Sequence, residues 1–315
     1  MASNFNVTAL SAYTKTNEET LIIKSFFEPK TASMMQVLTG VKSVIQVPAL
    51  SQNVIFQSGA SCGFSASGNT TLSARDLTVG RVKINHEWCM ADLETKYTQL
   101  LLSPGSNYTA LPGKLDQAFA ELMVGQIAQD LETAIWSGDT TSWNSQLNPF
   151  DGLIKIIGAA SGTVAANAAA YMTPVTAVTA ANVIAILDGI YTAIPAALLG
   201  KPDLKVFIGN DMARMYQTAL KNANLYNYPV SNESANGEFK IAGTDVTVVP
   251  VNGLTGSNKA YALRTSNMFL GVDLENEEEE FKFWFSSDFD MVRFSSKFKY
   301  GVQISQPTEI VKFTL

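Results

Sequence analysis

The chain has 315 residues, of which 46% are hydrophobic and 16% are charged, and its formal net charge is −6. This length is typical of about two domains and is sufficient for a substantial buried core. The low charged fraction favours a surface largely covered by neighbouring molecules, with a larger than usual core as the alternative, and the net negative charge argues against avid nucleic-acid binding.

Residues 1–37 are predicted to form an N-terminal arm. Short apolar clusters at 21–23 and 26–27 lie among polar residues and are followed by Pro29. These clusters are too short to form a core alone, so we expect the arm to lie against a neighbouring subunit. Residues 1–20 lack the apolar segment of a signal peptide, and no stretch reaches the roughly 18 apolar residues of a membrane helix, so no membrane association is expected.

Residues 38–95 are predicted to form a long two-stranded hairpin. Apolar segments at 44–47 and 54–57 make the outgoing strand, and Pro48 between them indicates an edge or broken strand. The tip at 58–71 consists mainly of Gly, Ser, Ala and Asn, which favour turns. The return strand is expected at 77–88. Because a hairpin of this length is not stable alone, it requires a surface to lie on.

The sequence contains no recognisable catalytic or metal-binding constellation. Cys62 and Cys89 form neither a disulfide framework nor a zinc signature, so we expect free thiols. The single histidine, His86, is expected on the same strand face as Ile84 and Trp88 and is interpreted as a packed core or interface residue rather than a catalytic base. Nucleophile-elbow, phosphate-loop and dinucleotide motifs are all missing. The chain is therefore predicted not to be an enzyme, with no catalytic, cofactor-binding or metal site.

A long helix is predicted at 114–136, after a short helix at 91–102 and glycine and proline breakers at 104–105 and 112–113. At 1.5 Å per residue, this helix has a length of roughly 34 Å. Its apolar residues recur with helical spacing. The expected stripe consists of Leu115, Ala118, Phe119, Leu122, Ile127, Leu131, Ala134 and Ile135.

Residues 175–260 predict a compact α/β unit. We expect a helix capped by Thr179 and ending near residue 197, a buried strand at 206–208, and a second helix from Met212 to residue 220. A hairpin with its turn near Gly243 is expected at 239–250.

The segment from 261 to the end is predicted to contain an unusually long strand. From residue 292 to 304 apolar and polar residues alternate almost without interruption, which indicates a strand with one buried face. At ~3.3 Å per residue it would span roughly 43 Å, which suits a flat, extended subunit. The predicted buried face consists of Val292, Phe294, Phe298, Tyr300, Val302 and Ile304, and the polar face of Arg293, Ser295, Lys297, Lys299 and Gln303.

Acidic residues gather just before this strand, at Asp273, Glu275 and 277–280. They could bind calcium, which takes six to eight oxygen ligands, but they lack the spacing of an EF-hand loop. A solvated turn is the favoured interpretation. Contact with a basic surface of a neighbouring subunit is a further possibility, and in that case exchange of the acids for glutamine would hinder assembly.

The order of these C-terminal motifs resembles that of tailed-phage major capsid proteins with the Hong Kong 97-type fold. The motifs are Leu270-Gly-Val-Asp-Leu, the acidic stretch, the aromatic strand from Phe281, Arg293-Phe, and Lys299-Tyr-Gly-Val. The resemblance extends over nearly the whole chain and implies an α+β capsid fold. Its expected parts are an N-terminal arm at 1–37, an extended loop (E-loop) hairpin at 38–95, a peripheral domain at 96–174 with a spine helix at 114–136, an axial domain at 175–260, and peripheral-domain strands with a C-terminal return at 261–315.

The resemblance implies a major capsid protein that forms hexamers and pentamers of an icosahedral phage head. Such a shell encloses double-stranded DNA without sequence-specific binding, contacts a portal and in some cases decoration or scaffolding proteins, and is assembled in the host bacterial cytoplasm to become part of the virion. The short arm predicts no proteolytic cleavage, and the lack of lysine between Gln57 and Arg81 predicts non-covalent shells. The alternative is an encapsulin-type nanocompartment shell with the same fold. An enzyme or adhesin on an α+β scaffold is a third hypothesis, which the missing catalytic residues disfavour.

Overall fold

The computed structural model describes residues 29–58, 67–89, 112–223, 237–274, 281–286, 288–289 and 291–315. These residues form a five-stranded, a six-stranded and a two-stranded sheet, with helices packed beside the two larger sheets. The fold is α+β, as predicted. Its longer helices are α3 (Pro112–Ser137), α5 (Val183–Ala193) and α6 (Asn210–Asn222), and α4 (Leu153–Ala159) is shorter.

The five-stranded sheet is built around one long strand, β12 (Met291–Ile304). The predicted strand at 292–304 is therefore confirmed, and its apolar face is buried at Phe294, Phe298, Tyr300, Val302 and Ile304. β12 pairs antiparallel with three strands, and a fourth joins parallel to β10. These strands are β1 (Gln36–Thr39), β4 (Gly80–Cys89), β10 (Met268–Leu274) and β11 (Phe281–Ser286).

Helix α3 covers the buried face of this sheet and confirms the helix predicted at 114–136. Leu122, however, is 69% exposed, so its place in the predicted apolar stripe was wrong. The buried stripe instead runs through Val124, Ile127, Ala128, Leu131, Ala134 and Ile135. At 100° per residue, Leu122 lies roughly opposite Leu131 on the helix. The side chains at 115, 118 and 119 lie outside the described part.

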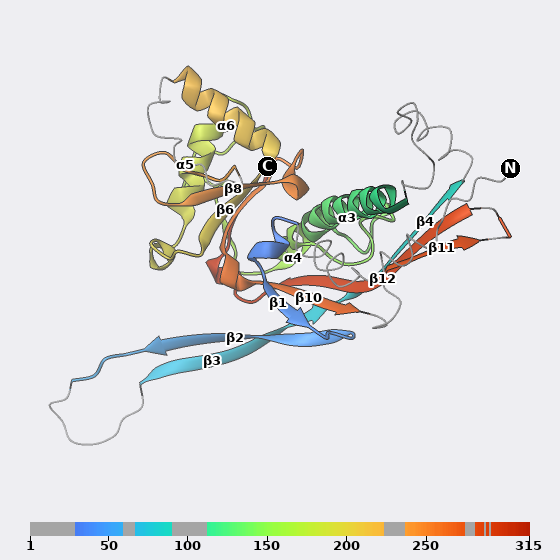
Figure 1. Cartoon of the computed structure of the whole chain (residues 1–315). Helices are drawn as coiled ribbons and strands as arrows, with labels where there is room; N and C mark the ends of the chain where they lie inside the picture. Colours follow the sequence, from blue (N-terminus) through green and yellow to red (C-terminus); the bar gives the residue numbers. More distant parts are fainter. Residues whose placement is uncertain are drawn as a thin grey trace.

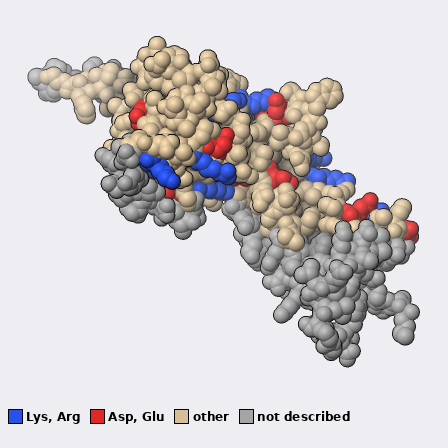
Figure 2. All heavy atoms as spheres, turned by 90° about the horizontal axis from the view of Figure 1, so that it is seen from above, with Lys and Arg blue, Asp and Glu red and all other residues tan. Residues whose placement is uncertain are grey.

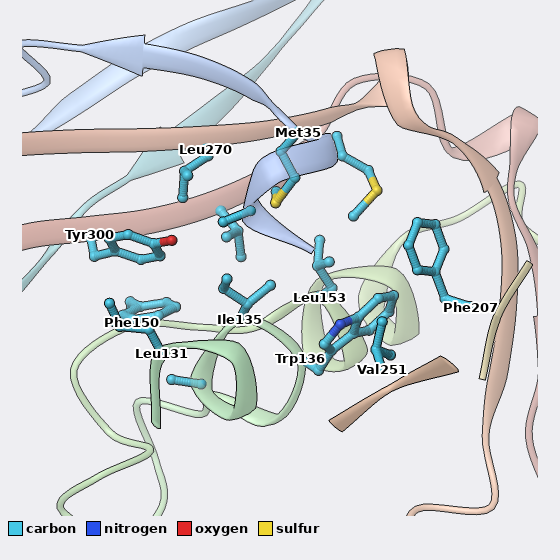
Figure 3. Packing of buried hydrophobic residues seen from close by; sticks show 14 of the residues in the cluster. Met35, Leu131, Ile135, Trp136, Phe150, Leu153, Phe207, Val251, Leu270 and Tyr300 are labelled. Carbon is cyan, nitrogen blue, oxygen red and sulfur yellow. The ribbon is translucent and has the colours of Figure 1, made fainter. Parts of the chain in front are cut away.

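The last turn of α3 is the joint between the two larger sheets. The ring of Trp136 is fully buried and lies 5.4 Å from the ring of Phe207 in β6 and 5.7 Å from that of Tyr261 in β9. Ile135, next to Trp136, and Leu131, one turn earlier, lie near Phe150 and belong to the same cluster as Tyr300 (Figure 3). One continuous apolar cluster therefore joins the helix to both sheets.

The six-stranded sheet carries α5 and α6 and has its own apolar cluster. The predicted buried strand at 206–208, the helix after Gly209 and the hairpin at 239–250 are confirmed. Strands from both sides of position 260 contribute to this sheet. The strands are, in spatial order, β5 (Val164–Ala165), β13 (Val311–Phe313), β9 (Ala260–Arg264), β6 (Leu204–Gly209), β8 (Thr247–Val251) and β7 (Phe239–Lys240).

Helix α5 begins four residues later than its predicted cap, Thr179. The Thr179 backbone N–H donates to the side-chain oxygen of Asn182, and the Asn182 amide donates to the carbonyl oxygen of Ala177. These bonds hold 177–182 in a turn, so Asn182 is the residue that precedes the helix.

Part of the segment at 29–37 packs on its own chain. Thr31, Ala32 and Met35 are buried within the core of their own chain, which makes the arm prediction wrong for these residues. Residues 1–28 lie outside the described part. The segment is held in place by Glu132, a buried residue of α3. Both the backbone N–H and the hydroxyl of Thr31 donate to the Glu132 side chain, at 2.9 and 2.5 Å. The Trp136 indole donates to the same Thr31 hydroxyl at 2.8 Å.

The buried Glu132 is expected to make the free energy of unfolding depend on pH. Burial raises its pKa above the ordinary value of 4.5, and the hydrogen bonds from Thr31 only partly oppose this. The native state therefore retains the proton to higher pH than the unfolded chain. The free energy of unfolding is expected to fall as pH rises from 4.5 through the raised native pKa of Glu132.

Thermal denaturation of the Glu132→Gln variant across this pH range tests the prediction. Glutamine keeps the shape of the protonated acid but does not ionise, so this part of the pH dependence should be lost. Glu87→Gln, at an exposed position, is the matched control and should retain it. An unchanged profile in Glu132→Gln would contradict the assignment.

Candidate assembly surface

A two-stranded hairpin, β2 (Val44–Val54) paired with β3 (Gly68–Thr78), projects from the body of the molecule (Figure 1). The predicted hairpin is present, but β2 continues through Pro48 without a break. In a two-stranded sheet each strand has an unpaired edge, so a proline is tolerated there. Residues 67–71, predicted as part of the tip, are mostly in β3, and 59–66 lie outside the described part.

The return strand predicted at 77–88 is divided between two sheets. β3 ends at Thr78, and β4 begins at Gly80 and pairs with β12. His86 is exposed and stacks on Trp88 with ring centroids 4.4 Å apart, so it is not a core residue of its own chain, and the interface alternative stays a prediction. The side chain of Cys89 and the whole of Cys62 lie outside the described part.

The base of the hairpin is a small apolar cluster of its own. Val47 and Leu77, on the face directed toward the body, are fully buried. They pack with Val41 and Val79 against Leu38 and Phe269 of the large sheet. Beyond Ala49 the described apolar side chains of the hairpin are exposed.

Two glycines let the hairpin cross the large sheet at close range. Gly271 of β10 and Gly301 of β12 are direct neighbours in the ladder. A Cβ on Gly301 would lie 2.4 Å from the carbonyl oxygen of Thr78, and a Cβ on Gly271 would lie 2.4 Å from Cδ2 of Leu77. The paired glycines therefore form a notch in the sheet that receives the hairpin base.

Side chains at the end of β12 fix the direction of the hairpin by donating to its backbone carbonyls. Gln303 donates to Asp76 at 2.6 Å, and Ser305 donates to Pro48 at 3.0 Å. Gln306 donates to Leu50 at 3.1 Å. The buried Asn267 in turn accepts the backbone N–H groups of residues 305 and 306. These hydrogen bonds hold the hairpin, which is otherwise largely exposed, in one orientation.

The face of the hairpin turned away from the body is open to solvent and carries apolar side chains, among which Gln46, Asp76 and Thr70 are polar. Leu50 and Leu72 are paired directly and are 56% and 74% exposed. Phe56, just beyond the end of β2, is 97% exposed. Val44, Pro48, Val54 and Ala74 are also exposed on this same face. The adjacent pairs Leu50–Leu72 and Pro48–Ala74 therefore form an exposed apolar cluster, and a cluster of this kind marks a site of protein contact.

A second exposed aromatic lies on the loop that follows α3. Trp143 is fully exposed, and the loop that carries it is closed by Lys155, whose Nζ lies 2.7 Å from both Asp139 and Asp151. The hydrogen bond from Lys155 and those from Thr141 lower the pKa of Asp139 to about 2. Sequence reasoning passed over this loop, although a tryptophan among polar residues between Gly138-Asp139 and Asp151-Gly152 was a usable signal.

The described residues offer no alternative site of a chemical kind. They contain no group of three His, Cys, Asp or Glu side chains placed to hold a metal ion. Asp273, considered as a calcium ligand, pairs with Lys299 at 2.9 Å, and residues 275–280 lie outside the described part. None of the described helices is long and apolar enough to cross a membrane. In the view of Figure 2 most of the described surface is neither acidic nor basic.

No protein-family model and no curated protein sequence matches the chain. Among solved structures, the satellite phage P4 procapsid that includes the size determination (Sid) protein aligns over 94% of this chain and 98% of its own, with a TM-score of 0.60 and 9% identity. The capsid asymmetric unit of cyanophage A-1(L) covers 89% of this chain and 90% of its own, with a TM-score of 0.56 and 12% identity. A virus-like particle from Pyrococcus furiosus covers 94% and 96%, with a TM-score of 0.50 and 12% identity.

At these identities the similarity shows the fold. The chain has the Hong Kong 97-like fold of phage capsid proteins, in agreement with the resemblance found in its sequence.

Proposed function

We propose that this chain is the major capsid protein of a tailed phage and that it assembles into hexamers and pentamers of an icosahedral head around double-stranded DNA. The observation that carries the proposal is the projecting hairpin, whose apolar face has no partner among the described residues of its own chain. The capsid fold supports the same function. The role is structural and not enzymatic.

The parts of the molecule are proposed to share the work of assembly. The hairpin serves as the extended loop, α3 as the spine helix, and the five-stranded sheet as the core of the peripheral domain. The six-stranded sheet with α5 and α6 serves as the axial domain, to which β9 and β13 also contribute. Obligate interfaces bury roughly 2,000–5,000 Å², and a flat subunit with a long hairpin can distribute such an area over several neighbours.

The remaining partners and the location follow from this role. A portal, and possible decoration or scaffolding proteins, would contact the shell, and DNA would be enclosed without sequence-specific contacts. The particle would assemble in the host bacterial cytoplasm and become the virion. A nanocompartment of the encapsulin type is less well supported. The two phage capsid structures align with TM-scores of 0.60 and 0.56, above the 0.50 of the virus-like particle from Pyrococcus furiosus.

Negative-stain microscopy and size-exclusion chromatography of the expressed chain test the proposal. We expect closed particles of uniform size, far larger than the 34.0 kDa monomer. A chain that remains monomeric at high concentration would refute the shell function and revive the enzyme or adhesin hypothesis. Particles that co-purify with a protein cargo and no DNA would favour the nanocompartment.

A further inference from the structure

The outer face of the five-stranded sheet, opposite α3, carries a concentration of positive charge that its own chain only partly neutralises. β4 and β12 run antiparallel there, with Arg81 opposite Lys299 and Lys83 opposite Lys297. Further along the same face, beyond Ser295 opposite Asn85, Arg293 lies opposite Glu87. We call the five cationic residues Arg81, Lys83, Arg293, Lys297 and Lys299 the basic patch. It stands out because the chain as a whole has a net charge of −6.

Within the described residues, the two ends of the basic patch have carboxylate partners and its centre has none. Lys299 pairs with Asp273 at 2.9 Å, and Arg293 pairs with Glu87 at 3.4 Å. Lys83 and Lys297 are both exposed, and in the described part of the chain neither forms an ion pair with a carboxylate. Like charges directly opposite each other on paired strands are destabilising. An anionic partner would remove this repulsion.

The chain itself contains the complementary charge. Glutamates occupy position 275 and all four positions from 277 to 280. Electrostatic complementarity of this kind sets the register and selectivity of an interface. In a shell of identical subunits, every copy carries both the basic patch and the glutamates of the acidic run in its sequence, so the two can meet between neighbours.

We propose that the centre of the basic patch binds the acidic run at 277–280 of a second copy of this chain. The proposal rests on the proposed shell function and names one contact that would set the register between neighbouring subunits. It also explains why the cations are kept on a sheet face that the hairpin base leaves open, beyond the notch at Gly271 and Gly301.

A charge-swap experiment tests the contact. One variant combines Lys83→Glu with Lys297→Glu, and the other combines Glu278→Lys with Glu279→Lys. Each alone should need at least about tenfold more protein to assemble in low salt, because like charges then face each other. An equimolar mixture of the two should assemble at close to the original concentration. Circular dichroism should show that both variants are folded.

The matched control is Lys201→Glu with Lys221→Glu, two exposed lysines of the other sheet's domain, which should assemble normally. The proposal is overturned if the patch variant assembles as well as this control. It is also overturned if one chain carrying both charge swaps assembles while the mixture does not, because the contact then lies within a chain. Normal shells that lose only their DNA would show instead that the patch binds nucleic acid.

Association of the variants is also measured by sedimentation velocity, which does not require closed particles. If the unaltered chain forms no shell but the charge swaps still change its pairwise association as described, the shell function fails and the contact stands. If shells form and none of the swaps affects them, the contact fails and the shell function stands.

Discussion

Replacing Leu50 and Leu72 by asparagine is expected to abolish assembly at concentrations where the unaltered chain forms particles, and to leave the monomer folded. The two side chains are paired on the outer face of the hairpin and are 56% and 74% exposed, so the monomer loses little packing. Burial of a leucine stabilises by about 1.5–3 kcal/mol, and ~1.4 kcal/mol is a factor of ten. Because both leucines are already partly covered in the monomer, the double substitution should lower the association constant of each contact made by the hairpin by roughly ten- to a thousand-fold.

Light scattering against protein concentration measures the loss, and circular dichroism checks the fold. The control exchanges two exposed leucines outside the hairpin, Leu122→Asn with Leu199→Asn. It should reduce assembly far less than the hairpin variant. Equal losses in the two variants would mean that general surface hydrophobicity, and not the hairpin, drives association.

Gly301→Ala is expected to have the second largest effect, through the notch that seats the hairpin base. The added Cβ would lie 2.4 Å from the backbone carbonyl oxygen of Thr78, which cannot move without shifting the hairpin. Overpacking of this kind destabilises by about 1–3 kcal/mol. We expect a lower melting temperature, faster proteolysis within the hairpin, and impaired assembly.

Alanine substitutions at two further glycines serve as comparisons for Gly301→Ala. Gly271→Ala should be milder, because its Cβ meets the end of a leucine side chain, Cδ2 of Leu77, which can rotate. Gly125→Ala, in α3, has nothing within 4 Å of the added methyl group and should stabilise by up to ~1 kcal/mol. If Gly301→Ala behaved like Gly125→Ala, the hairpin would not be seated in the notch.

The sequence by itself determined the elements whose pattern is local and long. The alternation in β12 and the helical spacing in α3 each extend over many residues, so both were predicted close to their true ends. The unit with β6, α6 and the β7–β8 hairpin was predictable for the same reason. The capsid fold was implied by a resemblance, carried by the order of the C-terminal motifs from Leu270 to Val302, and not by the periodicity of any single element.

Only the tertiary structure determined those features for which contacts between distant residues outweigh the local sequence pattern. Residues 77–88 read as one strand, but the chain passes from one sheet to another at Val79, where Gly80 packs tightly against the backbone of Pro149. Glu132 looks like a surface residue of a helix and is buried, because Thr31, a hundred residues away in sequence, satisfies its oxygens. The basic patch exists only because β4 and β12 lie side by side in one register. Periodicity specifies which face of a strand is apolar, but long-range packing selects the partner strand and therefore the side chains that meet.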